Sequence, residues 1–159
     1  MFKTILWDFD GVILDSMHIR NLGFKKVFEG FPDLEVAKLL EYHLENGGLS
    51  RYTKIRYFFE KIRNEEISEE QVNEYASSFS KIMRRELVNS DNLIEDSLSF
   101  IKKYHHQYNF HIVSGSDQNE LRFLCKELDI EQYFISIHGS PTSKIILVSE
   151  LLNQHGYDK

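Results

Sequence analysis

The chain has 159 residues, 42% of them hydrophobic and 28% charged, a size that fits one ordinary domain or a small core with an inserted lobe. Only two prolines and eight glycines exclude a collagen-like or low-complexity chain, and twelve phenylalanines with eight tyrosines argue against disorder. The net charge of −6 argues against a nucleic-acid partner, because phosphate backbones are bound by basic surfaces. The apolar runs are too short to span a bilayer, so we expect no membrane partner. A single cysteine, Cys125, favours a reducing, cytoplasmic setting.

Three short apolar segments each run into a polar loop that contains glycine. They span residues 2–7, 109–113 and 133–137. Short apolar strands that alternate with helical stretches are typical of a parallel sheet covered by helices. The sequence therefore predicts an α/β fold with a parallel, Rossmann-like core sheet.

The interval between the first two of these strands contains no convincing strand. Apolar periodicity predicts helices near residues 17–29, 34–46, 51–63 and 68–88. A parallel crossover needs only about a dozen residues, so the surplus predicts an inserted all-helical cap. We expect the cap to span residues 17–90 and the α/β core to comprise residues 1–16 and 91–159, with further helices at 92–105, at 118–128 and from 144 onward.

Two carboxylates stand directly after the first predicted strand, in Asp8-Phe9-Asp10-Gly11-Val12. The carboxyl ends of parallel strands form the edge at which open α/β sheets bind ligands. Carboxylate oxygens suit Mg²⁺, and a carboxylate can also act as a nucleophile that forms an acyl phosphate. The alternative is a turn whose acids cap backbone amides and face water.

Polar residues also follow the second strand, in Ser114-Gly115-Ser116-Asp117. A hydroxyl group and free amides at a helix N-terminus can bind an anion. The alternative is an ordinary N-cap, because Asp117 and Glu120 have the spacing of a capping box.

Two basic residues stand at the starts of other helices. Lys144 opens the last helix, where it opposes the helix dipole and could instead meet the acids and a phosphate; the alternative is a solvated surface lysine. Arg51 follows Gly48-Leu49-Ser50 and could recognise a phosphate. The alternative is that Ser50 is an ordinary helix N-cap and Arg51 is exposed to solvent. We expect the basic cluster between residues 51 and 63 to be a solvated helix surface.

The order of these motifs resembles the haloacid dehalogenase-like hydrolase superfamily, in the branch with a helical cap between the first two core motifs. Asp8-Phe9-Asp10-Gly11-Val12 matches the first motif, and Ser114 and Lys144 match the second and third. Gly48-Leu49-Ser50-Arg51 is similar to the cap loop of sugar-phosphate members such as beta-phosphoglucomutase.

This resemblance implies a Mg²⁺-dependent phosphatase that acts on a small phosphorylated metabolite such as a sugar phosphate. Asp8 would attack phosphorus and become an aspartyl phosphate, while Asp10 would protonate the leaving alcohol and then assist water. Mg²⁺ would bind Asp8 and the backbone carbonyl of Asp10. Ser114, Gly115 and Lys144 would hold the phosphoryl group, and Arg51 would contact the substrate from the cap. Phosphoryl transfer needs little beyond such an in-line nucleophile and neutralised oxygens.

The chain departs from the family pattern in two ways. No acidic pair after a fourth strand follows the helix that starts near Lys144, and Asp158 is a poor substitute; we therefore expect C-terminal core strands to be absent from this chain and the first strand to form an edge of the sheet. Arg20 stands where many relatives carry histidine, which makes a phosphosugar mutase a weaker alternative. A binding module without catalysis is the alternative from another class, and the oligomeric state is left open.

Overall fold

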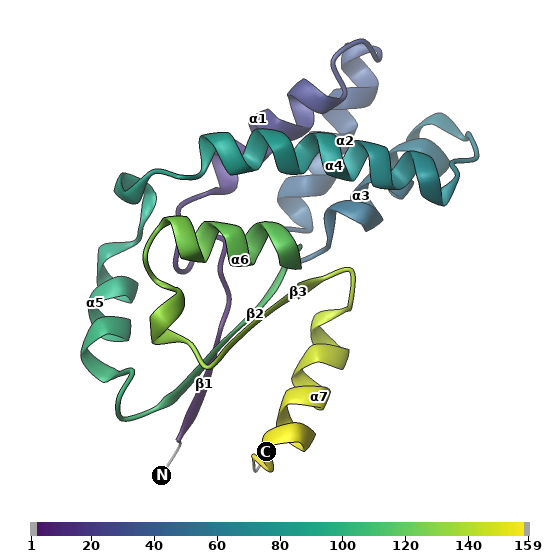
Figure 1. The fold of residues 1–159 in the computed structure, drawn as a ribbon. Helices are drawn as coiled ribbons and strands as arrows, with labels where there is room; N and C mark the ends of the chain where they lie inside the picture. Colours follow the sequence, from purple (N-terminus) through teal and green to yellow (C-terminus); the bar gives the residue numbers. More distant parts are fainter. Residues whose placement is uncertain (1–2, 158–159) are drawn as a thin grey trace.

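The computed structural model describes residues 3–157 and contains a three-stranded parallel sheet in the order β1-β2-β3 (Figure 1). The strands are β1 (Thr4–Trp7), β2 (Asn109–Asp117) and β3 (Ser136–Ser140). The predicted parallel sheet is confirmed, except that the predicted first strand began at Phe2, which lies outside the described residues. Within residues 3–157, β1 forms an edge of the sheet and no strand follows the last helix. Asp158 also lies outside the described residues.

The second and third strands differ from their predicted bounds. β2 continues through the polar loop to Asp117, because Asp117 pairs with Ser140 after a register irregularity that follows Val113. The segment Glu131–Tyr133 forms a short 3-10 helix, so β3 begins later than apolar character alone predicted. Pairing with a neighbouring strand thus determines where these strands end, and local composition does not contain that information.

Helices cover both faces of the sheet. Alternate residues of β2 face opposite sides, as the period of a strand requires. Phe110 and Ile112 belong to the main core with buried residues of α5 (Glu95–Tyr104) and α6 (Gln118–Glu127). Val113 packs on the other side with Leu147 and Leu151 of α7 (Lys144–His155). Each face of this short sheet is therefore shielded from water.

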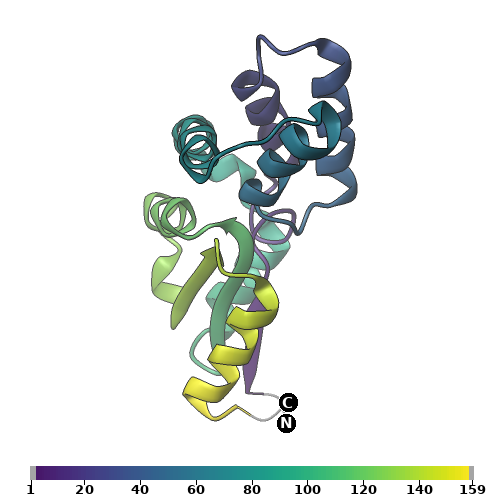
Figure 2. The ribbon, with the colours of Figure 1, turned by 90° about the vertical axis from the view of Figure 1, so that its right-hand side faces the viewer.

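The segment between β1 and β2 is helical, as predicted. Its elements are α1 (Met17–Val27), α2 (Asp33–Glu45), α3 (Arg51–Tyr57), a π-helical turn (Phe58–Arg63), α4 (Glu69–Glu86) and a short 3-10 helix (Ser90–Asn92). Figures 1 and 2 show α1 to α4 gathered at the end of the sheet where the strands finish. We call these four helices the cap helices. None of the helices in residues 3–157 is long and apolar enough to cross a membrane.

Sequence signals for helix ends and core are visible in this helical region. The Ser50 side chain accepts a hydrogen bond from the Thr53 amide, and Ser68 forms a full capping box with Gln71. Between the helices, buried aromatic rings fill the interior, among them Phe24, Phe28, Phe58 and Phe79. The cap helices therefore have an aromatic interior of their own, continuous with the main core.

The cap helices touch the sheet end at a backbone-to-backbone contact. A Cβ atom placed on Gly115 would lie 2.4 Å from the carbonyl oxygen of Gly48. Only a residue without a side chain permits such a close approach. Gly48 follows α2 and Gly115 lies near the end of β2, so this contact presses the loop of the cap helices onto the strand end.

Candidate active site

Two predicted site residues meet at the mouth of the sheet. The ammonium group of Lys144, at the first position of α7, lies 2.6 Å from Asp8 Oδ2 at the end of β1. Asp8 Oδ1 accepts a hydrogen bond of 2.8 Å from the amide of Phe9. Both side chains remain about one-third exposed, at 33% for Lys144 and 39% for Asp8. The Asp8 carboxylate is therefore anchored by a cation and still open to a small ligand.

The second carboxylate of the first motif is held from three sides. Asp10 Oδ1 accepts hydrogen bonds from the Ser16 hydroxyl and from Nε of Arg20, and Oδ2 accepts one from the Ser116 hydroxyl, each at 2.5 Å. Burial disfavours the charged form, but the Arg20 charge and these hydrogen bonds outweigh it and lower the pKa of Asp10. In this arrangement Asp10 is a carboxylate and carries no proton.

Ser114 and Gly115 lie in the last part of β2, and Gly115 faces the loop at Gly48. The buried Ser114 hydroxyl accepts a hydrogen bond of 3.1 Å from the amide of Ser116, whose own hydroxyl reaches Asp10. Ser114 is thus connected to Asp10 through Ser116, and no direct hydrogen bond joins Ser114 to Asp8 within the described residues. The structure brings Asp8, Lys144, Asp10 and Ser114 to one edge of the sheet.

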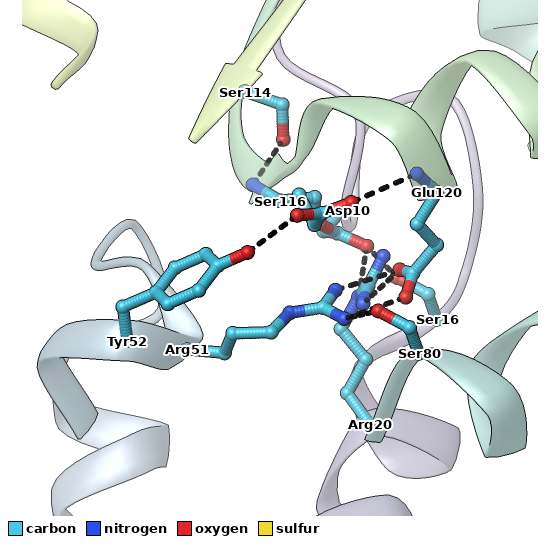
Figure 3. A network of polar contacts seen from close by, with 10 residues as sticks. Asp10, Ser16, Arg20, Arg51, Tyr52, Ser80, Ser114, Ser116 and Glu120 are labelled. Atoms are coloured by element: carbon cyan, nitrogen blue, oxygen red, sulfur yellow. Dashed lines mark hydrogen bonds and ion pairs between the residues drawn. The ribbon is translucent and has the colours of Figure 1, made fainter. Parts of the chain in front are cut away.

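Arg51 is buried, although the sequence predicted that it lies on a solvated helix surface. Its side chain is only 3% exposed, and its guanidinium lies 4.6 Å from the centre of the Phe79 ring. Nη1 and Nη2 donate to the two carboxylate oxygens of Glu120 at 2.7 and 2.8 Å (Figure 3). Nη1 also donates to the Ser80 hydroxyl at 2.6 Å. Arg51 therefore ties three helices together, and its contact with substrate stays a prediction.

Glu120 was predicted only as part of the capping box at the start of α6, but its carboxylate also accepts the hydrogen bonds from Arg51. The N-cap itself is confirmed, since Asp117 Oδ1 accepts the Glu120 amide at 3.0 Å. The Glu120 side chain, however, is fully buried and binds Arg51 and also Nη1 of Arg20, at 3.0 Å. Its position four residues before the buried Leu124 places it beside the apolar face of α6, and that was the available signal. A carboxylate on such a face needs buried cations to compensate its desolvation.

A second buried polar pair was also missed. Lys54 belongs to the basic cluster expected to be solvated, but it is 2% exposed, so that expectation is wrong for Lys54 as it is for Arg51. The Lys54 ammonium lies 2.8 Å from Nδ1 of the buried His43. Burial lowers the pKa of Lys54 to about 8 and that of His43 to about 4, and the positive charge of Lys54 adds to the effect on His43. At neutral pH the lysine is mostly charged and the histidine is neutral.

The donor set at the mouth fits Mg²⁺ in kind but offers few protein ligands. Magnesium is commonly bound through one or two carboxylates, with water and substrate phosphate filling the remaining positions. Asp8 offers an accessible carboxylate, whereas both oxygens of the Asp10 side chain are already engaged. In residues 3–157 no group of three or more acidic, histidine or cysteine side chains is placed to hold a metal. That Mg²⁺ would bind the Asp8 carboxylate and the backbone carbonyl of Asp10 stays a prediction.

The structure thus combines a parallel α/β core, a helical insert after the first strand and two acids at the end of that strand. Residues 5–158 match the haloacid dehalogenase-like hydrolase family. The chain belongs to this family, and the predicted resemblance is confirmed. A search of curated proteins finds no match.

Solved structures share the fold at low sequence identity. Beta-phosphoglucomutase from Clostridium difficile is 20% identical, with a TM-score of 0.72, over 95% of this chain and 70% of its own. CbbY from Rhodobacter sphaeroides in complex with phosphate is 14% identical, with a TM-score of 0.70, over 96% and 73%. The HAD-hydrolase YfnB from Bacillus subtilis bound to magnesium is 18% identical, with a TM-score of 0.58, over 87% and 65%. The chain thus spans about 70% of its neighbours' length, and within residues 3–157 no core strand follows α7, as predicted.

Proposed function

We propose that this protein is a Mg²⁺-dependent phosphatase that hydrolyses a small phosphorylated metabolite, such as a sugar phosphate, through an aspartyl-phosphate intermediate. The observation that carries the proposal is the contact of Asp8 with Lys144 at the mouth of the sheet. An accessible carboxylate beside a fixed cation is what an attack on a phosphoryl group requires. The neighbours crystallised with phosphate or with magnesium support the same class of chemistry. We also propose a cytoplasmic setting, in keeping with the single buried and reduced cysteine.

The first half-reaction transfers the phosphoryl group to Asp8. A carboxylate oxygen of Asp8 bonds to phosphorus as the bond from phosphorus to the substrate oxygen breaks. Asp10, in the protonated state that the second half-reaction leaves behind, gives its proton to that oxygen. Lys144, the Ser114 hydroxyl and the Gly115 amide are the groups we assign to the phosphoryl oxygens, because stabilising their charge is the main task of the protein in this reaction. Bound Mg²⁺ would supply further positive charge at the same oxygens.

The second half-reaction returns Asp8 to its starting state. Water attacks phosphorus, Asp10 takes a proton from that water, and the bond between phosphorus and Asp8 breaks to release inorganic phosphate. Asp10 is already unprotonated in this structure, which is the state the second half requires. For the first half, the hold of Arg20 on Asp10 must weaken, so we assign Arg20 a positioning role on Asp10. We keep the division into a core, 1–16 and 91–159, and a cap, 17–90, as part of this proposal.

The proposal is tested by phosphate release from a panel of phosphorylated metabolites, with Mg²⁺ present or chelated. We expect Mg²⁺-dependent release by the native chain and its loss in Asp8→Asn, which keeps the shape of the side chain. Asp15→Asn is the matched control, since Asp15 is exposed and lies three residues beyond the motif. Normal turnover by Asp8→Asn would refute the assignment of the nucleophile. An isomeric sugar phosphate as product, without free phosphate, would indicate the mutase.

A further inference from the structure

A small cavity lies between the cap helices and the end of β2, next to Asp10. Its walls include Arg20 of α1, His43 of α2 and Lys54 of α3, together with Ser116 of β2. The cavity has a volume of about 20 Å³, which is enough for about one water-sized group. It therefore adjoins the side of Asp10 that faces the cap helices, where the part of a substrate beyond its phosphate would lie.

Hydrogen-bond donors around this cavity lack acceptors. Nη2 of Arg20 and Nε2 of His43 are buried and have no partner. Because a charged lysine can only donate, the contact of Lys54 with Nδ1 places the proton of neutral His43 on Nε2. His43 is also the only hydrogen-bond partner that residues 3–157 provide for the Lys54 ammonium. Buried donors without acceptors are costly, so a group that accepts hydrogen bonds would relieve all three side chains.

The charges around the cavity are also unbalanced. Arg20, Arg51 and Lys54 bring three positive charges, whereas Asp10 and Glu120 bring two negative charges and are both bonded to the arginines. The described residues place no carboxylate within ion-pair distance of Lys54. Buried charges are normally paired. The missing partner is therefore an anion that the protein itself does not supply.

We propose that this cavity binds a carboxylate of the substrate, so that the phosphate esters this protein hydrolyses are phosphorylated hydroxy acids. The substrate carboxylate would accept hydrogen bonds from Lys54, from Nη2 of Arg20 and from Nε2 of His43. The size of the cavity favours a carboxylate oxygen over the larger second phosphate of a bisphosphate. This inference rests on the proposed phosphatase function, because it places the carboxylate on the leaving alcohol next to Asp10.

The test compares two esters that differ only in the charged group. Phosphoglycolate carries the carboxylate, and 2-hydroxyethyl phosphate replaces it with a neutral alcohol. We expect the native chain to prefer phosphoglycolate in kcat/KM, and Lys54→Met to reduce that preference by about 10- to 100-fold, the value of a hydrogen bond to a charged group. Lys38→Met, at an exposed position of α2, is the matched control and should keep the native preference.

A binding measurement separates this inference from the proposed function. Glycolate, the alcohol that phosphoglycolate would release, should raise the melting temperature of the native chain, and ethylene glycol should not. The shift in melting temperature should vanish in Lys54→Met. Lys54→Gln should lose it as well, and this variant serves if Lys54→Met folds poorly, because its amide can still donate a hydrogen bond to His43. If no ester is hydrolysed but glycolate still gives a Lys54-dependent shift, the phosphatase proposal fails and the carboxylate site stands. Equal turnover of both esters, without a Lys54-dependent shift, would overturn the carboxylate site and leave the phosphatase proposal intact.

Discussion

The contact between Gly48 and Gly115 gives the sharpest test of how closely the cap helices sit on the sheet. In Gly115→Ala the added methyl carbon would lie 2.4 Å from the Gly48 carbonyl oxygen, which is a backbone atom and cannot rotate away. The loop and the strand must separate by about 1 Å to restore ordinary contact. That movement would stretch the hydrogen bonds of 2.7 and 2.8 Å between Arg51 and Glu120 beyond useful length. We expect a loss of about 1–3 kcal/mol of unfolding free energy.

The assay is thermal unfolding followed by circular dichroism. For a chain of this size the expected loss lowers the melting temperature by about 3–10 °C. Gly48→Ala is the matched control, because a Cβ on Gly48 meets nothing within 4 Å, and the same chemical change there should be neutral or slightly stabilising. If the 1 Å shift reaches the reacting groups, Gly115→Ala should also reduce kcat/KM by about 100-fold. A native melting temperature for Gly115→Ala, or equal damage from both variants, would refute this description of the contact.

Two further predictions concern buried charge. Glu120→Gln keeps the shape of the side chain but removes a negative charge that two guanidinium groups share, so urea unfolding should show a loss of about 3–5 kcal/mol of unfolding free energy. The control is Glu127→Gln at an exposed position of the same helix, which should leave the unfolding free energy almost unchanged. A loss below about 1 kcal/mol for Glu120→Gln would contradict the prediction. Burial and two nearby histidines lower the pKa of His111 to about 4. Between pH 6.5 and 4, His111 is therefore protonated in the unfolded chain but neutral in the folded chain. His111 should therefore contribute a fall in stability between pH 6.5 and 4 of at most about 1.4 kcal/mol per pH unit, in addition to the contribution of His43, whose pKa is also lowered to about 4. His111→Asn, compared with exposed His18→Asn, should flatten the slope of stability against pH; an unchanged slope would show that His111 does not contribute to it.

The local signals in the sequence predicted much of this molecule correctly. The helical region between the first two strands and the helix starts at Ser50, Asp117 and Lys144 were all confirmed. These features depend on neighbours within about four residues, through apolar periodicity and capping, so the sequence contains them. The edge position of the first strand followed from the family resemblance and the missing fourth strand. The meeting of Asp8 with Lys144 followed from the order of motifs on a parallel sheet.

Contacts between distant segments were beyond the reach of local signals. Arg51 and Lys54 have the composition of a solvated helix surface, and only the packing of α3 against α2, α4 and α6 buries them. Glu120 satisfies the spacing of a cap, yet its side chain compensates two arginines that lie 69 and 100 residues away in the chain.

The sequence by itself determined the α/β class, the helical insert and the acids, hydroxyl group and lysine at the strand ends. Only the tertiary structure decided which charges are buried, which of them compensate one another, and which donors beside Asp10 are left without an acceptor. The physical reason is that the cost of burying a charge depends on every group within a few ångströms, and most of those groups come from other elements of the chain.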